Sequence, residues 1–127
     1  MKPTIILIAN PAAKKASGEK TEHALTLLRS AGYDVAVAVD GQEALALLAE
    51  GPYDIVVSDV EMPKVDGFQL TASIKGNEKY SHIPVILVTS LQSDAHRRRG
   101  LEVGADAYIT KGSFDQNNLL DTIRRLT

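Results

Sequence analysis

The chain has 127 residues, with 14 Lys and Arg against 16 Asp and Glu and a formal net charge of -2 at neutral pH. This length suits one domain over residues 1–127, and the balanced charge favours neither a nucleic-acid partner nor a membrane surface. There is no cysteine and no apolar segment long enough to cross a bilayer, which excludes disulfides and thiolate metal sites and favours a cytoplasmic location.

Short apolar runs recur along the chain, and each is followed by a segment in which a helix fits. The runs are Thr4 to Ala9, Asp34 to Val39, Ile55 to Ser58, Val85 to Thr89 and Ala107 to Ile109. Most of them are too continuous to be half-exposed strands. They therefore predict parallel strands that are covered on both faces.

Helices are predicted between these strands, where apolar residues recur at helical spacing, as at residues 23–28, 44–48 and 119–126. Gly32 and Gly51 stand where two of the helices should stop, since glycine tolerates the left-handed conformation of a C-terminal cap. The alternation of strand and helix predicts an α/β fold, a doubly wound parallel sheet of five strands with helices on both faces.

Polar residues stand where the predicted strands end. Asp59 closes the third strand, Thr89 closes the fourth, and Lys111 follows the fifth. Ligands of an open parallel sheet bind at the carboxyl ends of its strands. A carboxylate can attack phosphorus, while a lysine and a hydroxyl can stabilise phosphoryl oxygens, so the three residues together indicate phosphoryl chemistry. Each residue alone has an ordinary structural explanation, as a turn former, a strand residue or a solvated cation.

The segments SDVEMPKVDGF, VILVTS and GADAYITKG resemble, in this order and at this spacing, the CheY-type receiver domain of two-component response regulators. The resemblance implies flavodoxin-like topology with strand order 2-1-3-4-5 and a signalling domain rather than an enzyme. It also implies that Asp59 is the phosphoacceptor, Thr89 the switch hydroxyl and Lys111 the phosphate-binding lysine. Tyr108 matches the aromatic switch residue, although packing in the core explains it equally well. Glu61 matches the position whose backbone carbonyl ligates Mg²⁺.

The resemblance further implies the partners. A phosphohistidine of a histidine kinase or phosphotransfer domain supplies the phosphoryl group, and Mg²⁺ bridges it to the carboxylate of Asp59. The fourth helix, fifth strand and fifth helix form the face for a protein target. Residues 88–123 are similar to receivers fused to CheA-type chemotaxis histidine kinases, which we expect as the source of this chain. The run His96-Arg97-Arg98-Arg99 in the fourth helix is either a partner-facing patch or a solvated helix face.

The end of the first strand departs from the family pattern. Asn10 and Pro11 stand where receivers usually carry two acidic residues that hold Mg²⁺. Asn10 can offer one neutral oxygen and Pro11 offers no side-chain ligand, whereas Mg²⁺ prefers anionic oxygens. Binding of Mg²⁺ is therefore expected to be weak or absent.

The loop that follows Pro11 is longer than the family pattern, and three interpretations of it stay open. It is a solvated loop, it places Lys14 or Lys15 over the site in place of the metal's charge, or it brings Glu19 or Glu22 back as a substitute ligand.

Two other functions also stay open. The domain could act as a pseudo-receiver, an interaction module that works without phosphorylation. More remotely, ILIANPAAKKASGEK looks faintly like the opening strand and nucleotide loop of lipid kinases, although the run lacks the first glycine of a complete phosphate-binding loop.

Overall fold

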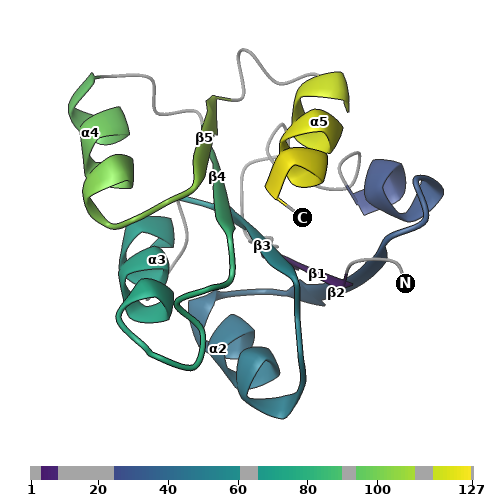
Figure 1. Cartoon of the computed structure of the whole chain (residues 1–127), viewed down its shortest axis with the longest axis horizontal. Helices are drawn as coiled ribbons and strands as arrows, with labels where there is room; N and C mark the ends of the chain where they lie inside the picture. Colours follow the sequence, from purple (N-terminus) through teal and green to yellow (C-terminus); the bar gives the residue numbers. More distant parts are fainter. Residues whose placement is uncertain (1–3, 9–24, 61–65, 90–93, 111–115, 127) are drawn as a thin grey trace.

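The structure is a computed structural model that describes residues 4–8, 25–60, 66–89, 94–110 and 116–126 (Figure 1). Five parallel strands form one sheet in the order β2-β1-β3-β4-β5. The strands are β1 (Thr4–Ile8), β2 (Asp34–Ala38), β3 (Ile55–Asp59), β4 (Val85–Thr89) and β5 (Ala107–Thr110). The predicted fold class and strand order are therefore confirmed. The predicted strands differ from the observed ones by at most one residue at an end, and the predicted end of the first strand, Ala9, lies outside the described residues.

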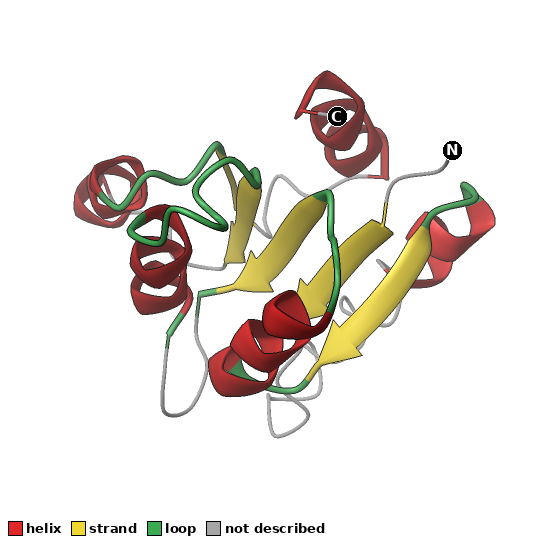
Figure 2. Cartoon of the chain, turned by 60° about the horizontal axis from the view of Figure 1, so that its bottom comes forward, coloured by secondary structure: helices red, strands yellow, loops and turns green. Residues whose placement is uncertain are grey.

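Helices cover both faces of this sheet (Figures 1 and 2). One face carries α2 (Gly41–Glu50), α3 (Gly67–Lys75) and α4 (Asp94–Glu102). The other face carries α5 (Gln116–Leu126) and a helical segment at residues 25–30. None of the helices in these described ranges combines the length and the apolar character that a bilayer crossing requires.

The hydrophobic core has two halves, one on each face of the sheet. Alternate strand residues supply them, since Ile6 and Ile8 pack into the half under α2 and α3, whereas Ile5 and Leu7 pack into the half under α5. All four side chains are buried. Because successive side chains of a strand point to opposite faces, a continuous apolar run is what a strand covered on both faces requires.

The two glycines that were predicted to end helices behave differently. Gly32 has a φ of 95°, and its N–H donates to the carbonyl of Arg29 while the N–H of Tyr33 donates to the carbonyl of Leu28. This is a left-handed C-terminal cap, as predicted. Gly51 also follows a helix, but its φ of -168° is extended backbone that any residue can adopt, so the prediction of a left-handed cap there was wrong.

An ion pair joins the last turn of α3 to the start of β5. Lys75 Nζ lies 2.9 Å from Asp106 Oδ2 and also donates to the carbonyl of Ile83 at 2.9 Å. The same Asp106 oxygen accepts from the N–H of Val85, whose carbonyl accepts in turn from the N–H of Asp106. These contacts hold the amino ends of β4 and β5 in register, at the edge of the sheet opposite the strand ends discussed next.

Candidate functional site

The carboxyl ends of β3, β4 and β5 lie side by side. Asp59 pairs with Val88, and Thr89 pairs with Thr110, in the two parallel ladders. The backbones of Asp59 and Thr89 therefore lie at the same end of the sheet, where the neighbouring strands β3 and β4 have their carboxyl ends. Lys111 follows directly after Thr110, but Lys111 itself and the side chain of Thr89 lie outside the residues that the structure describes.

Asp59 is buried at the carboxyl end of β3, with 8% of the residue exposed. It is the one buried ionisable residue in the described part of the chain. The hydroxyl of the neighbouring Ser58 is fully buried and donates to the Asp59 carbonyl oxygen at 2.8 Å. Burial of a carboxylate costs free energy unless other groups compensate it. A buried aspartate at the end of a central strand is therefore a candidate for chemistry.

The described residues do not by themselves make a site for a divalent cation. Among them, no group of three or more His, Cys, Asp or Glu side chains is placed to hold a metal ion. Asp59 supplies one carboxylate, while Asn10, Pro11 and Glu61 lie outside the described residues. Mg²⁺ requires several hard oxygen ligands, and among the described residues at these strand ends Asp59 is the one that supplies a carboxylate.

The start of α3 lies against the backbone of Asp59. Asp66 caps the helix, because its carboxylate accepts from the N–H of Gln69 at 2.8 Å, while the Gln69 side chain accepts from the N–H of Asp66 at 3.1 Å. The N–H of Gly67 donates to the carbonyl of Val60 at 2.9 Å. A Cβ atom on Gly67 would stand 2.5 Å from the Asp59 carbonyl oxygen, so only glycine permits this approach.

Tyr108 lies at the junction of β5 and α4. The residue is half-buried and packs against the core half under α2 and α3. Arg97 lies over its ring, with the guanidinium carbon 5.8 Å from the ring centroid, and Arg99 lies over the ring of Phe68 at 5.4 Å. These distances suit cation–π contacts. Tyr108 thus packs against the core and against α4, as the packing interpretation predicts, while its role as a switch residue stays a prediction.

Helix α4 itself is almost entirely exposed or half-exposed, and Gly100 is its one buried residue. The arginine run therefore lies on a solvated helix, while Arg97 and Arg99 also cover aromatic rings. Sequence reasoning missed the roles of Gly67 and Gly100. Gly67 begins α3 and Gly100 lies inside the polar helix α4, and the cost of a glycine in helix propensity is the signal that the sequence offers at both positions.

A flavodoxin-like α/β domain that brings a buried aspartate and a threonine to the carboxyl ends of its third and fourth strands is of the CheY-like class. The chain belongs to the response regulator receiver domain family, whose profile matches residues 20–124.

Known proteins that are similar to this chain support the same family. It is 43% identical over 101 residues to the gliding motility regulatory protein of Myxococcus xanthus and 40% identical over 99 residues to protein PilG of Pseudomonas aeruginosa. These matches cover 80% and 78% of this chain, but 13% and 73% of the two relatives. The chemotaxis response regulator CheY4 of Vibrio cholerae has a TM-score of 0.85 at 27% identity, with both chains fully covered.

These comparisons confirm the predicted family. The chain is a receiver domain of the kind that works in two-component and chemotaxis signalling. The family match favours a receiver over the lipid-kinase interpretation. That interpretation rested on a segment that lies mostly outside the described residues. The roles of Asp59, Thr89, Tyr108 and Lys111, and the fusion to a CheA-type kinase, stay predictions.

Proposed function

We propose that Asp59 accepts a phosphoryl group from the phosphohistidine of a histidine kinase or phosphotransfer domain, with weak dependence on Mg²⁺. The observation that carries the proposal is the burial of Asp59 at the carboxyl end of β3, with the backbone of Thr89 in the neighbouring strand. Carboxylate, hydroxyl and lysine at three adjacent strand ends form a set that can receive and hold a phosphoryl group.

The transfer is a substitution at phosphorus. A carboxylate oxygen of Asp59 forms the new oxygen–phosphorus bond as the phosphorus–nitrogen bond of the partner's phosphohistidine breaks, and the imidazole leaves with the bonding electron pair. The product on this chain is an acyl phosphate. The ammonium of Lys111 offsets the charge of the phosphoryl oxygens, and the hydroxyl of Thr89 donates a hydrogen bond to one of them.

The weak dependence on Mg²⁺ follows from the donor set. Asp59 is the one carboxylate that the described part of the site supplies, and Asn10 and Pro11 add at most one neutral side-chain oxygen. A divalent cation that binds here gains few anionic oxygens in exchange for its water ligands. The affinity of the site for Mg²⁺ is therefore low. Transfer to Asp59 accordingly depends mainly on residues of the chain, above all Lys111.

The protein target is proposed to bind the face formed by α4, β5 and α5. Tyr108 connects the site to this face, since its strand also carries Thr110 and its ring packs against α4. The face offers a partner three consecutive exposed arginines, Arg97 to Arg99. A shift of the Tyr108 ring on phosphorylation would move α4, because the ring lies against Gly100, the buried residue of that helix.

A second candidate is a pseudo-receiver that binds partners without phosphorylation. The specific observation in its favour is the Asn10-Pro11 pair in place of two acidic residues. Both candidates use the same fold and the same face. They differ in whether Asp59 is ever modified.

Intact mass spectrometry separates the two candidates. The chain is incubated with phosphoramidate, whose phosphorus–nitrogen bond resembles that of phosphohistidine, over a Mg²⁺ series that starts from metal-free buffer. The expected result is the addition of one phosphoryl group with little dependence on Mg²⁺, and no addition to the Asp59→Asn variant. No modification at any concentration of metal or donor would overturn the phosphoacceptor role and leave the pseudo-receiver.

A further inference from the structure

Strand β2 forms one edge of the sheet. It pairs with β1 on its inner side, and no strand of the described chain pairs with its outer side. The outer side of an edge strand presents backbone N–H and C=O groups to which another extended chain can bind. Edge strands are commonly protected from this by lysine, proline or a bulge, but β2 reads DVAVA and pairs with β1 residue for residue.

Exposed apolar side chains gather on this edge. Val37 and Val39 are 37% and 41% exposed, and they account for two of the three large hydrophobic residues that are exposed in the described ranges, the third being Leu101 at 74%. Val37 belongs to β2 and Val39 follows it directly. An edge strand that exposes apolar side chains, and whose outer side pairs with no described strand, is a surface to which another strand can be added.

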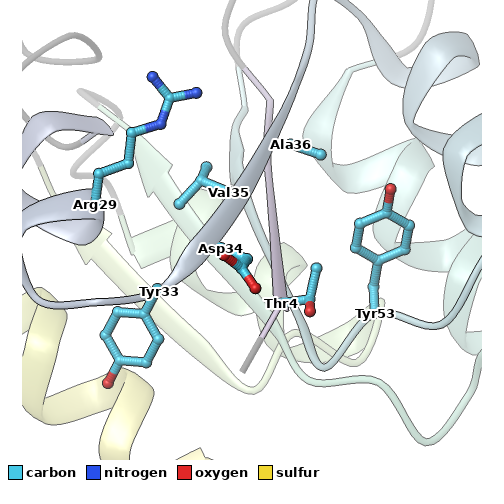
Figure 3. Close-up of a pocket in the computed structure, with 7 residues that line it drawn as sticks. All are labelled: Thr4, Arg29, Tyr33, Asp34, Val35, Ala36 and Tyr53. Carbon is cyan, nitrogen blue, oxygen red and sulfur yellow. The ribbon is translucent and has the colours of Figure 1, made fainter. Parts of the chain in front are cut away.

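A cavity of about 440 Å³ borders the amino-terminal part of the same strand, at Asp34, Val35 and Ala36, next to the exposed valines (Figure 3). Figure 3 shows Arg29 and Val35 on one side of the β2 ribbon, and Ala36 and Tyr53 on the other side. The core contacts agree, because Val35 packs with the core half under α5 and Tyr53 packs with the half under α2. The lining residues are Thr4, Arg29, Tyr33, Asp34, Val35, Ala36 and Tyr53.

The position of the lining residues on both sides of β2 favours an extended peptide as the ligand. An occupant that fills the cavity must contact both sides of the edge strand, and an extended peptide does so because its side chains alternate between the two faces. Its main chain can also pair with the outer N–H and C=O groups of β2. The side chain of Arg29 has no hydrogen bond or ion pair with the rest of the described chain, so its charge is available to an acidic residue of the peptide.

We infer that the outer edge of β2 is a docking site for an extended segment of a partner protein, which adds a strand to the sheet and places an acidic side chain near Arg29. The site lies along the strand that is farthest in the sheet order from β4 and β5. It therefore lies at the opposite edge of the sheet from β5, and binding there does not require phosphorylation of Asp59.

The first part of the experiment is a titration with a designed peptide. A capped peptide with the sequence Glu-Val-Thr-Val-Thr-Val is added to the ¹⁵N-labelled chain while amide chemical shifts are recorded. The expected result is saturable shifts at residues 33–39 and at Tyr53. The same peptide with alternate amides N-methylated should bind at least about tenfold more weakly, because it loses main-chain hydrogen bonds. Equal binding of the two peptides, or no shifts along β2 up to the solubility limit, would overturn the proposal.

The second part uses a matched pair of variants. Val37→Lys places a charge on the edge and should weaken binding of the unmodified peptide by about tenfold, since lysine opposes strand addition. Leu101→Lys makes the same change at an exposed residue of α4 and should leave binding unchanged. Thermal unfolding of both variants verifies that they fold. The proposal is wrong if folded Val37→Lys binds as well as the unaltered chain, or if Leu101→Lys loses binding to the same extent.

Discussion

The ring of Tyr108 lies directly against Gly100, with its Cδ2 atom 2.9 Å from the position that a Cβ atom would take on that glycine. Gly100 is the one buried residue of α4, and the ring of Tyr108 lies against it. Two arginines that precede it, Arg97 and Arg99, lie over the rings of Tyr108 and Phe68 and support the same packing. Small changes at Gly100 should therefore alter how α4 lies on β5.

We predict that Gly100→Ala lowers the free energy of unfolding by up to about 2 kcal/mol, because overpacking costs about 1 to 3 kcal/mol and improved helix propensity offsets up to about 1 of it. Urea denaturation followed by circular dichroism measures the change. Gly51→Ala is the control, since no atom beyond its chain neighbours lies within 4 Å of the position that the added methyl group would take, and its backbone is extended. Unchanged stability of Gly100→Ala would mean that the Tyr108 ring moves aside freely.

Gly67→Ala should affect the phosphoacceptor directly. The added methyl would meet the carbonyl oxygen of Asp59 at 2.5 Å and the Cα atom of Val60 at 2.8 Å, and these backbone atoms can move aside only if β3 or α3 shifts. We expect a loss of about 1 to 3 kcal/mol of stability. We also expect slower phosphorylation of Asp59 by phosphoramidate than in the unaltered chain. If the folded variant is phosphorylated at the original rate, the position of α3 has no influence on the site.

The ion pair of Lys75 and Asp106 should contribute more to stability than the exposed pair of Arg124 and Asp121. The first pair is 2.9 Å apart with side chains 20% and 33% exposed, and the second is 3.6 Å apart with side chains 65% and 63% exposed. Lys75→Met should cost about 1 to 3 kcal/mol, since it also removes a hydrogen bond to the carbonyl of Ile83. Arg124→Met should change stability by less than about 0.5 kcal/mol. Equal effects in urea denaturation would contradict this ranking.

Replacement of Asn10 and Pro11 by aspartate should restore a magnesium site. Two added carboxylates together with that of Asp59 would offer the ion several anionic oxygens, so its affinity should rise by at least about tenfold in a calorimetric titration. Asp59→Asn in the altered chain should reduce the affinity again, which serves as the control. If the double substitution leaves the affinity for Mg²⁺ unchanged, the geometry of the loop and not the missing carboxylates is the obstacle.

The order of elements was predictable because it rests on local patterns. Continuous apolar runs such as the one at β3 indicate strands covered on both faces, and helical segments between them require parallel crossovers. The predicted convergence of Asp59 and Thr89 follows from the same rule, since the carboxyl ends of parallel strands share one edge. Gly51 shows the limit of such reasoning. A glycine after a helix predicts a left-handed C-terminal cap, but the backbone at Gly51 is extended, a conformation that any residue can adopt.

By itself, then, the sequence determined that this protein is a five-stranded α/β receiver with a carboxylate, a hydroxyl and a lysine at adjacent strand ends, and that acidic residues are missing after the first strand. Only the tertiary structure decided that Gly67 touches the backbone of Asp59, that Gly100 receives the ring of Tyr108, and that the edge of β2 borders a cavity. The physical reason is that local periodicity specifies which face of an element is buried, whereas the space beside a glycine or a strand edge depends on how elements distant in the sequence pack together.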